Sequence, residues 1–271
     1  MLTLVEIRTA AGLMLSLPLD NSDNGFWIKD FDGLDPVKAT IVSSSFAGMD
    51  GQQYQSSRRE SRNLLLKLGL EPNEGTVQDL RKRLYSFLMP KSPVSLRYYM
   101  ADTLTVDIDG RVESLEADRF TKEPEADISI MCFDPDFYAL EPTEITGMYT
   151  SDVDPTLVTY TGTVETGVLL TVNVNRSVDA FTVYHLPPND ELQILEFAAA
   201  LVAGDVIEIN TVAGNKYARL TREGTTSSIL YAVSPQSKWI ELQTGVNELR
   251  VEAEGDAIPL TFEYLNKYGA L

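Results

Sequence analysis

The sequence predicts a mainly β protein with two domains: a sheet-rich N-terminal domain that carries one α-helix, and a C-terminal β-sandwich. Three observations lead to this fold class. The chain of 271 residues exceeds the usual size of one domain. Apolar and polar side chains alternate in many short segments, which is the period of a strand with one buried face. Only one segment has a sustained helical period.

The N-terminal domain is expected over residues 1–140 and consists mostly of strands. Asp109-Gly110 lies between two alternating segments and predicts a two-residue hairpin turn, because both central positions of such a turn favour positive φ. The predicted strands are Leu2–Arg8, Gly12–Leu17, Phe26–Phe31, Lys38–Phe46, Arg62–Leu70, Val94–Met100, Leu104–Asp109, Arg111–Ala117 and Glu125–Phe133.

One amphipathic helix interrupts these strands, in the sequence EGTVQDLRKRLYSFLMP. Thr76 can cap the helix together with Asp79 three residues on, and Pro90 ends the pattern. The apolar stripe consists of Val77, Leu80, Leu84 and Leu88. We therefore expect the helix to lie on the sheet with this stripe buried.

A linker is predicted at residues 141–153, because the surrounding sequence is rich in proline and has no sustained period. From 154 to 271 the alternation recurs about every ten residues, which is typical of a β-sandwich. The segment ELQILEFAAALVAG is ambiguous between a helix and two short strands, and we interpret it as strands because its neighbours are β. Buried faces are expected for Leu170, Val172 and Val174; Phe181 and Val183; Ile207 and Ile209; Leu249 and Val251; and Leu260, Phe262 and Tyr264.

The composition excludes several classes of protein. The net charge of −18 means that the surface should repel nucleic acid. No apolar run approaches the roughly 20 residues that span a bilayer, and the N-terminus lacks the pattern of a signal peptide, so we expect a soluble protein without membrane insertion. The single cysteine, Cys132, lies on an apolar strand, which predicts a buried, inert thiol.

No catalytic or metal-binding constellation stands out, so neither an enzyme nor a cofactor is predicted. The one histidine, His185, continues a buried alternation, which indicates a structural imidazole bonded to a neighbouring backbone group. It lies too far along the chain from Cys132 to suggest a zinc site. The stretch Asp20–Gly25 resembles the start of a calcium loop, but Phe31 occupies the position that requires glutamate. Glycine-rich phosphate loops are absent from the sequence.

Two basic clusters and one group of aromatic residues could contact partners. We interpret Arg81-Lys82-Arg83 as a solvated helix face and Arg58-Arg59-x-x-Arg62 as a contact for an acidic protein. In the C-terminal domain, four aromatic side chains could form a platform for a sugar or a partner, although the pattern around Trp239 more often belongs to a core. These four are Tyr184, Tyr217, Tyr231 and Trp239.

Several segments occur in a characteristic order. They are DFDGLDP, SSSFAGMDGQQYQSSRRESRNLLLKLGLEPN, the predicted helix and RVESLEADRFTKEPEADISIMCFDPDFY, followed by GDVIEINTVAGNKYARL, SKWIELQTGVNELRV and FEYLNKYGAL. In this order the chain resembles the distal tail protein of long-tailed phages with non-contractile tails. The resemblance covers nearly the whole chain and is sharpest from Asp30 to Phe137.

The resemblance implies a structural virion protein of the tail tip, made in the host cytoplasm. Its N-terminal domain would be a β-barrel or sandwich related to tail-tube subunits and would form a homo-hexameric ring, single or stacked in two. The ring would join the tail tube protein to a hub or fibre protein and leave a channel through which DNA passes without specific binding.

The resemblance also implies a second domain that is a galectin-like or carbohydrate-module-like sandwich. This domain would project outward and hold a receptor-binding protein. The alternative is a carbohydrate-binding module that attaches the tail tip to polysaccharide on the host cell surface.

Ring subunits need contacts that reach a neighbour, and the polar segment Ser43–Ser61 has the composition of such an arm. Its glycines permit a tight tip, and the arginines that follow can pair with carboxylates of the next subunit. The residues expected at the ring interface are Phe46, Gly48, Met49, Asp50, Gly51, Tyr54, Arg58, Arg59 and Arg62.

Overall fold

The computed structural model spans residues 1–271 and describes all of them except 22, 49, 102, 151–153 and 189–190. The described chain folds into two compact units, each with its own hydrophobic core. Unit 1 consists of Met1–Leu140 and Tyr268–Leu271, and unit 2 consists of Glu141–Lys267. Both units are built mainly from strands, so the predicted mainly β fold class is confirmed.

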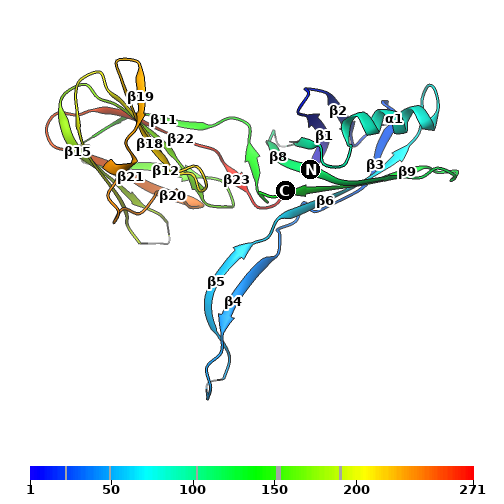
Figure 1. Ribbon diagram of the computed structural model, residues 1–271, viewed down its shortest axis with the longest axis horizontal. Coiled ribbons are helices and arrows are strands. Elements are labelled where there is room, and N and C mark those ends of the chain that lie inside the picture. Colours follow the sequence, from blue (N-terminus) through cyan, green and yellow to red (C-terminus); the bar gives the residue numbers. More distant parts are fainter. Residues whose placement is uncertain (22, 49, 102, 151–153, 189–190) are drawn as a thin grey trace. The chain divides into compact units, whose positions relative to one another are not determined.

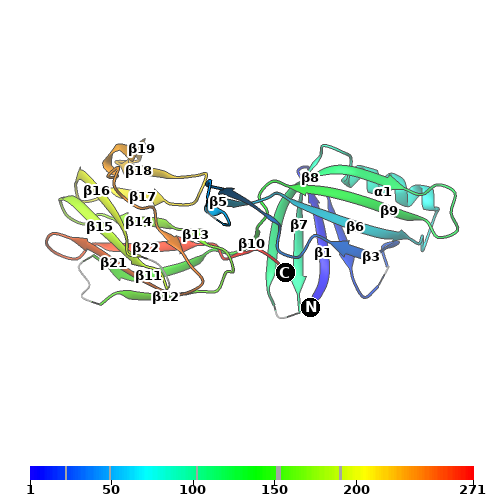
Figure 2. The same cartoon turned by 90° about the horizontal axis from the view of Figure 1, so that it is seen from below.

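Unit 1 is a curled antiparallel sheet, a half-barrel, with one helix on its concave side (Figures 1 and 2). The strand order is β2-β1-β7-β8-β9-β6-β3, and β10 pairs with β8 and with β23. The elements are β1 Leu2–Thr9, β2 Met14–Pro18, β3 Phe26–Asp32, β6 Arg62–Leu70, α1 Val77–Phe87, β7 Pro93–Met100, β8 Thr105–Ala117, β9 Glu125–Cys132, β10 Phe137–Ala139 and, at the boundary with unit 2, β23 Lys267–Tyr268.

The helix α1 begins as the sequence predicts. The Thr76 hydroxyl accepts a hydrogen bond from the Asp79 backbone N–H, and the Asp79 carboxylate accepts one from the Thr76 N–H, which completes a capping box. The hydrogen bonds from Thr76 lower the pKa of Asp79. Leu80, Leu84 and Leu88 are buried in the core of unit 1, so the predicted stripe packs on the sheet.

The predicted turn at Asp109-Gly110 is wrong. One long strand, β8, runs through both residues and pairs with β7 and β9. Gly110 faces the core, where an added Cβ would lie 2.6 Å from Cγ2 of Ile130 and 2.9 Å from the Cys132 sulfur. Glycine is therefore present because two strands pack closely, which is the other common reason for a glycine inside a strand.

The segment predicted to be an arm forms an antiparallel hairpin. Its strands, β4 Ala39–Ser44 and β5 Gln53–Arg59, form a two-stranded sheet of their own. Figure 1 shows that this hairpin extends away from the main sheet of unit 1. A strand was expected over Lys38–Phe46, which contains β4, whereas β5 lies in the polar segment that was expected to form an arm.

Arg62, at the start of β6, is buried at the root of the hairpin with a relative exposure of 1%. Its guanidinium lies 4.5 Å from the Phe137 ring centre. The guanidinium donates hydrogen bonds to the backbone carbonyls of Gly33, Asp35, Pro135 and Gly269. Burial lowers the pKa of Arg62. The prediction that Arg62 lies at a subunit interface is therefore wrong, because all of its polar contacts are within unit 1.

Unit 2 is a β-sandwich. A sheet of order β11-β22-β14-β17-β18-β19 and a sheet of order β12-β21-β15-β16 share one core, and the short strands β13 and β20 pair separately. Every side chain predicted to lie on a buried face of this domain is buried. The elements are β11 Thr143–Tyr149, β12 Thr156–Tyr160, β13 Thr166–Gly167, β14 Leu169–Asn173, β15 Val178–Leu186, β16 Gln193–Leu201, β17 Val206–Asn210, β18 Tyr217–Arg222, β19 Thr225–Ser228, the 3₁₀ turn η1 Leu230–Ala232, β20 Glu241–Leu242, β21 Gly245–Ala253 and β22 Pro259–Tyr264.

The ends of unit 2 differ from the predicted boundaries. Most of the predicted linker is strand β11, which pairs with β22; residues 151–153 of the linker lie outside the described residues. The last four residues return to unit 1, where the Leu271 N–H donates to the Leu34 carbonyl. ELQILEFAAALVAG is β, as interpreted, but forms the single strand β16 instead of two.

We expect Arg62→Met to lower the free energy of unfolding of unit 1 by at least about 3 kcal/mol. The reason is that several buried carbonyls lose their donor, and each costs about 1–3 kcal/mol when left unpaired. Guanidinium denaturation in a Trp239→Phe background would follow Trp27, which lies in unit 1.

The matched control is Arg58→Met. Arg58 is exposed and has no hydrogen-bond or ion-pair partner among the described residues, so its loss should change stability by less than about 0.5 kcal/mol. Equal stabilities of the two variants would contradict the role assigned to Arg62.

Candidate functional site

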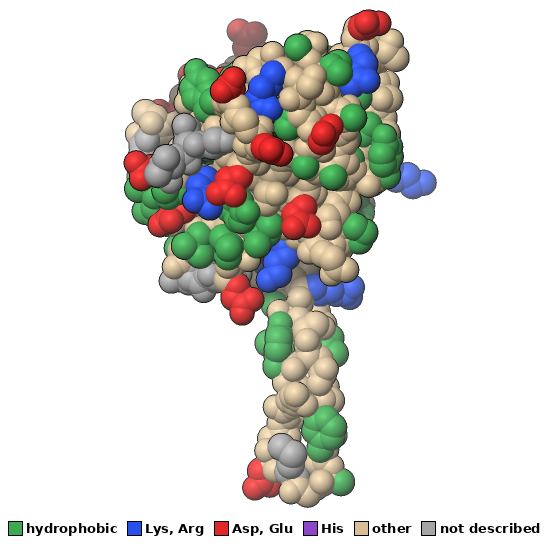
Figure 3. Space-filling view, turned by 90° about the vertical axis from the view of Figure 1, so that its left-hand side faces the viewer, with side chains coloured by type: hydrophobic (Ala, Val, Ile, Leu, Met, Phe, Trp, Pro, Cys, Tyr) green, Lys and Arg blue, Asp and Glu red, His purple; other side chains and the backbone are tan. Residues whose placement is uncertain are grey.

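The β4–β5 hairpin exposes apolar side chains on a narrow ribbon. The exposed fractions of Ile41, Phe46 and Tyr54 are 67%, 53% and 62%. Figure 3 shows hydrophobic side chains along the whole hairpin. Every residue of β5 is exposed, and an isolated two-stranded ribbon is only marginally stable in water. The hairpin therefore gains little from its own domain and presents a surface suited to a partner.

The root of the hairpin is fixed to unit 1 by an ion pair. Both terminal nitrogens of Arg59 donate to the carboxylate of Asp136, with a distance of 2.9 Å from Nη2 to Oδ2. The Asp136 side chain is 2% exposed, so the pair is screened from water on one side. Arg59 thus forms an ion pair within its own chain while its side chain stays 34% exposed, and its contact with a neighbouring subunit stays a prediction. Arg58 points to the other face of β5.

The tip of the hairpin has the geometry that its glycines suggested. Gly48 and Gly51 have φ values of +82° and +88°, a conformation that glycine adopts without strain. Asp50 is exposed and has no hydrogen-bond or ion-pair partner in the described part of the chain. Met49, also predicted for the interface, lies outside the described residues. The tip therefore offers an aromatic ring at Phe46 and an unpaired carboxylate at Asp50.

The face of the unit 1 sheet that points away from α1 is polar and mainly acidic. Some of its charges are paired: Arg97 donates twice to Asp107 at 2.7 Å, and Glu125 pairs with Lys29 and Lys67. These contacts lower the pKa of Glu125 and raise that of Lys67. A hollow of about 310 Å³ on this face is lined by Asp30, Asp32, Leu65, Leu66, Lys67, Ser114, Glu116, Asp127, Ile128 and Ser129.

His185 has a structural role. It is fully buried, its Nδ1 lies 3.0 Å from Oε1 of Gln193, and its Nε2 lies 3.0 Å from Oδ1 of Asn247. Its partners are therefore side-chain amides on the neighbouring strands, where a backbone group was expected. Cys132 is likewise buried, and burial raises its pKa to about 12, in agreement with an inert thiol.

The described residues contain no group of three or more His, Cys, Asp or Glu side chains placed to hold a metal ion. They also contain no helix with the length and apolar character needed to cross a bilayer.

The four aromatic residues proposed for a platform do not share a surface. Tyr184 lies on the outer face of the four-stranded sheet of unit 2, and Tyr217 lies on the outer face of the opposite sheet. Tyr231 is on η1 with 83% exposure, whereas Trp239 packs against the core. The prediction of one four-residue platform is therefore wrong. Tyr184 contacts Arg250, which lines a groove.

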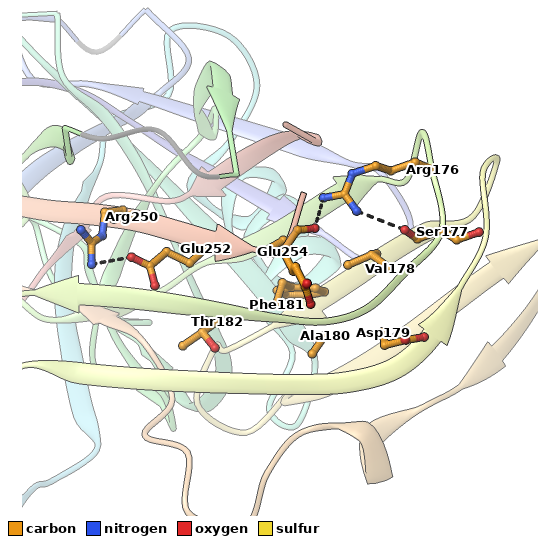
Figure 4. A pocket seen from close by; sticks show the side chains of 11 residues that line it. Arg176, Ser177, Val178, Asp179, Ala180, Phe181, Thr182, Arg250, Glu252 and Glu254 are labelled. Atoms are coloured by element: carbon orange, nitrogen blue, oxygen red, sulfur yellow. Dashed lines mark hydrogen bonds and ion pairs between the residues drawn. The ribbon is translucent and has the colours of Figure 1, made fainter. Parts of the chain in front are cut away.

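This groove, of about 820 Å³, lies where β15 and β21 diverge (Figure 4). The paired positions end at Phe181 opposite Ala253. Arg176 bridges the open end by donating to the backbone carbonyl of Glu254. On the rim, Arg250 and Glu252 form an ion pair of 2.7 Å. The groove thus places charged and hydrogen-bonding side chains of both signs beside small apolar residues such as Ala180 and Ala253. No sequence signal identified it, because it depends on where two distant strands separate.

The Arg250 guanidinium also lies 5.1 Å from the centre of the Tyr184 ring. Burial raises the pKa of Tyr184, and the nearby Glu252 carboxylate raises it further. The tyrosine is therefore a neutral hydrogen-bonding group beside the groove.

Comparison with known proteins places the chain in a family. The family described as siphovirus-type tail component, C-terminal domain, matches residues 161–268, and the phage tail protein RIFT-related domain matches residues 21–124. Together the two domains match most of both units. No curated protein matches the chain in sequence.

Solved structures of phage proteins are similar to this chain. The Dit protein (gp 19.1) of phage SPP1, described as a paradigm of the hub adsorption apparatus in phages that infect Gram-positive bacteria, has a TM-score of 0.68 at 19% identity. The match covers 97% of this chain and 98% of that chain. A chain of the phage P2 baseplate in its activated conformation with Ca matches with a TM-score of 0.45 and 11% identity over 100% of both chains.

The two family domains occur in the order of the two units, and the chain shares its whole fold with SPP1 Dit. The chain therefore belongs to the distal tail proteins of siphophages, a structural and non-enzymatic family of the tail hub or baseplate of the virion.

Proposed function

We propose that six copies of this chain form a ring, single or stacked in two, at the distal end of the tail. In this proposal unit 1 forms the ring, and DNA passes through the centre without specific binding. The ring joins the tail tube protein on one side to a hub or fibre protein on the other. The observation that carries the proposal is the β4–β5 hairpin, which has a fixed root and an exposed, partly apolar ribbon.

A hairpin of this kind suits the contact between successive subunits of a ring. In a cyclic assembly of more than two copies, each subunit uses one surface toward the next copy and a different surface toward the previous one. An element that projects from the domain supplies the first surface without disturbing the core. The ion pair of Arg59 with Asp136 sets its direction, so each copy presents the hairpin in the same way.

The acidic charge of the outer face of the unit 1 sheet is evidence for the proposed DNA channel. DNA has to slide through such a ring, so the lining must not hold phosphates. The described face carries more carboxylates than basic groups, and several of the basic groups are already paired with carboxylates. Carboxylates repel the DNA backbone at close range, and we therefore assign this face to the channel.

Unit 2 fits the role of a peripheral adaptor for a receptor-binding protein. It has a complete hydrophobic core of its own. An independently folded sandwich can be carried outside a ring without altering the ring contacts.

Shortening the hairpin should abolish the ring and leave both units folded. Val42 and Ser56 are opposite each other, so joining them through Asn-Gly gives a regular two-residue turn and removes the tip. Native mass spectrometry and negative-stain imaging should show rings for the full chain and monomers for the shortened one, with unchanged thermal unfolding. Rings formed by the shortened protein would contradict the assignment of the hairpin, and a full chain that stays monomeric at all concentrations would contradict the ring.

A second candidate function is contact with a neutral saccharide in the groove between β15 and β21. The observation that favours it is the composition of the groove, in which paired Arg250 and Glu252 stand beside Tyr184. Such a rim has little net charge and offers both donors and acceptors, which suits hydroxyl groups better than phosphates or metal ions.

The saccharide site can be tested by NMR titration with glucose, galactose, rhamnose and N-acetylglucosamine. We expect saturable shifts of the Thr182 and Glu252 amides with at least one sugar, and an affinity at least about tenfold weaker in Arg250→Ala. Arg219→Ala is the matched control, because Arg219 lies 4.0 Å from the Tyr217 ring on the other sheet. Absence of saturable shifts with all four sugars, or equal effects of both variants, would count against this site.

A further inference from the structure

We infer that the hairpin tip of one copy docks into an apolar groove on unit 1 of the next copy. This inference rests on the proposed ring and specifies the surface that receives the hairpin. It starts from a mismatch within unit 1: the hairpin carries exposed apolar side chains for which its own domain offers no cover.

The receiving groove has a volume of about 460 Å³ and lies at one end of the sheet. It is formed where β1 ends, β7 begins and the chain leaves β9, and it crosses the middle of β8. Its apolar part comes from Ala10, Pro93, Val94 and Phe133, and Phe133 is 71% exposed. An aromatic side chain this exposed, next to a hollow, is typical of the centre of a protein interface.

The tip of the hairpin matches this groove in chemistry. Phe46 supplies an aromatic ring for the apolar part. Arg111 lines the groove and uses one hydrogen bond to the Lys91 carbonyl, at 3.3 Å, so most of its donors remain available for the unpaired Asp50. Asp109, on the same groove, can accept from backbone N–H groups of the tip, which lie beyond the pairing of β4 with β5.

The other hollow on this sheet is a poorer match. Its lining carries four carboxylates and one amine, which together would repel Asp50, whereas the lining of the apolar groove carries two arginines and two carboxylates. The electrostatic comparison therefore favours the apolar groove over the acidic hollow.

The tip that fills the groove must come from another copy, because the hairpin is too long and straight to fold back to the groove of its own subunit. A strand of seven residues, such as β5, extends about 23 Å. The hairpin root is held by Asp136, which is close in sequence to Phe133 at the groove. A straight hairpin therefore carries its tip away from the groove of its own subunit. One tip and one groove per copy give a head-to-tail contact, the kind of contact from which closed rings are built when the rotation between copies divides a full turn.

Cysteine crosslinking tests this contact. Ala47→Cys at the tip and Ala10→Cys in the groove replace small exposed residues and leave Phe46 and Phe133 in place. The native thiol of Cys132 does not interfere, since burial keeps it protonated with a pKa of about 12. Under mild oxidation we expect a ladder of disulfide-linked oligomers on a denaturing gel.

The matched control is Ala47→Cys with Ala101→Cys, because Ala101 is also exposed but lies at the opposite end of β1 and β7. The control should give no ladder. Native mass spectrometry of each variant before oxidation separates two failures. Absence of rings would count against the proposed function. If rings form but Ala47→Cys with Ala10→Cys crosslinks no better than the control, the groove is not the docking site. Crosslinks confined within single chains would contradict the groove in the same way.

A charge exchange provides a second readout that needs no crosslink. We expect Asp50→Arg and Arg111→Asp each to weaken ring assembly at least about tenfold, and the double variant to recover most of it. Single variants that assemble like the unmodified protein would contradict the pairing of these two residues.

Discussion

The buried guanidinium of Arg62 holds together the part of unit 1 from which the hairpin extends. A cation removed from water is costly unless its donors find acceptors, and here backbone carbonyls from three separate segments accept four hydrogen bonds from it. These segments follow β3, follow β9 and end the chain, so none can form the site without the others. Asp136 follows Pro135, whose carbonyl accepts from Arg62, and its carboxylate holds Arg59. The hairpin root and the C-terminus therefore form one junction.

This junction allows an otherwise unfavourable element to exist. A polar two-stranded ribbon contributes little burial to its own domain, and its exposed apolar side chains would be a liability in a monomer. In an assembly the same features become useful, because the fixed root reduces the conformational entropy lost on docking while the tip provides the apolar contact. In the proposed ring, burial of these side chains at the interface would offset their cost in monomer stability.

The chemistry of the remaining polar groups agrees with a structural role. His185 and Cys132, the residues best suited to catalysis by type, are buried and occupied by packing or by amide partners. The ionisable groups that remain exposed are mostly carboxylates, distributed over both units, and they keep the surface acidic. Such a surface repels polyanions, as the proposed ring around DNA requires.

The sequence by itself determined the elements whose cause is local. Alternation identified the strands and the buried faces of unit 2, and Thr76 with Asp79 determined the start of α1, because period and capping depend on residues a few positions apart. Only the tertiary structure decided the roles of Gly110, Arg59 and Arg62. Gly110 suggests a turn in the sequence, and only the structure shows that it packs closely against Ile130. The three arginines look alike in the sequence. In the structure, remote partners make Arg59 part of an ion pair and Arg62 a buried hydrogen-bond donor, whereas Arg58 has no such partner among the described residues. Charge and composition carry no information about such long-range contacts.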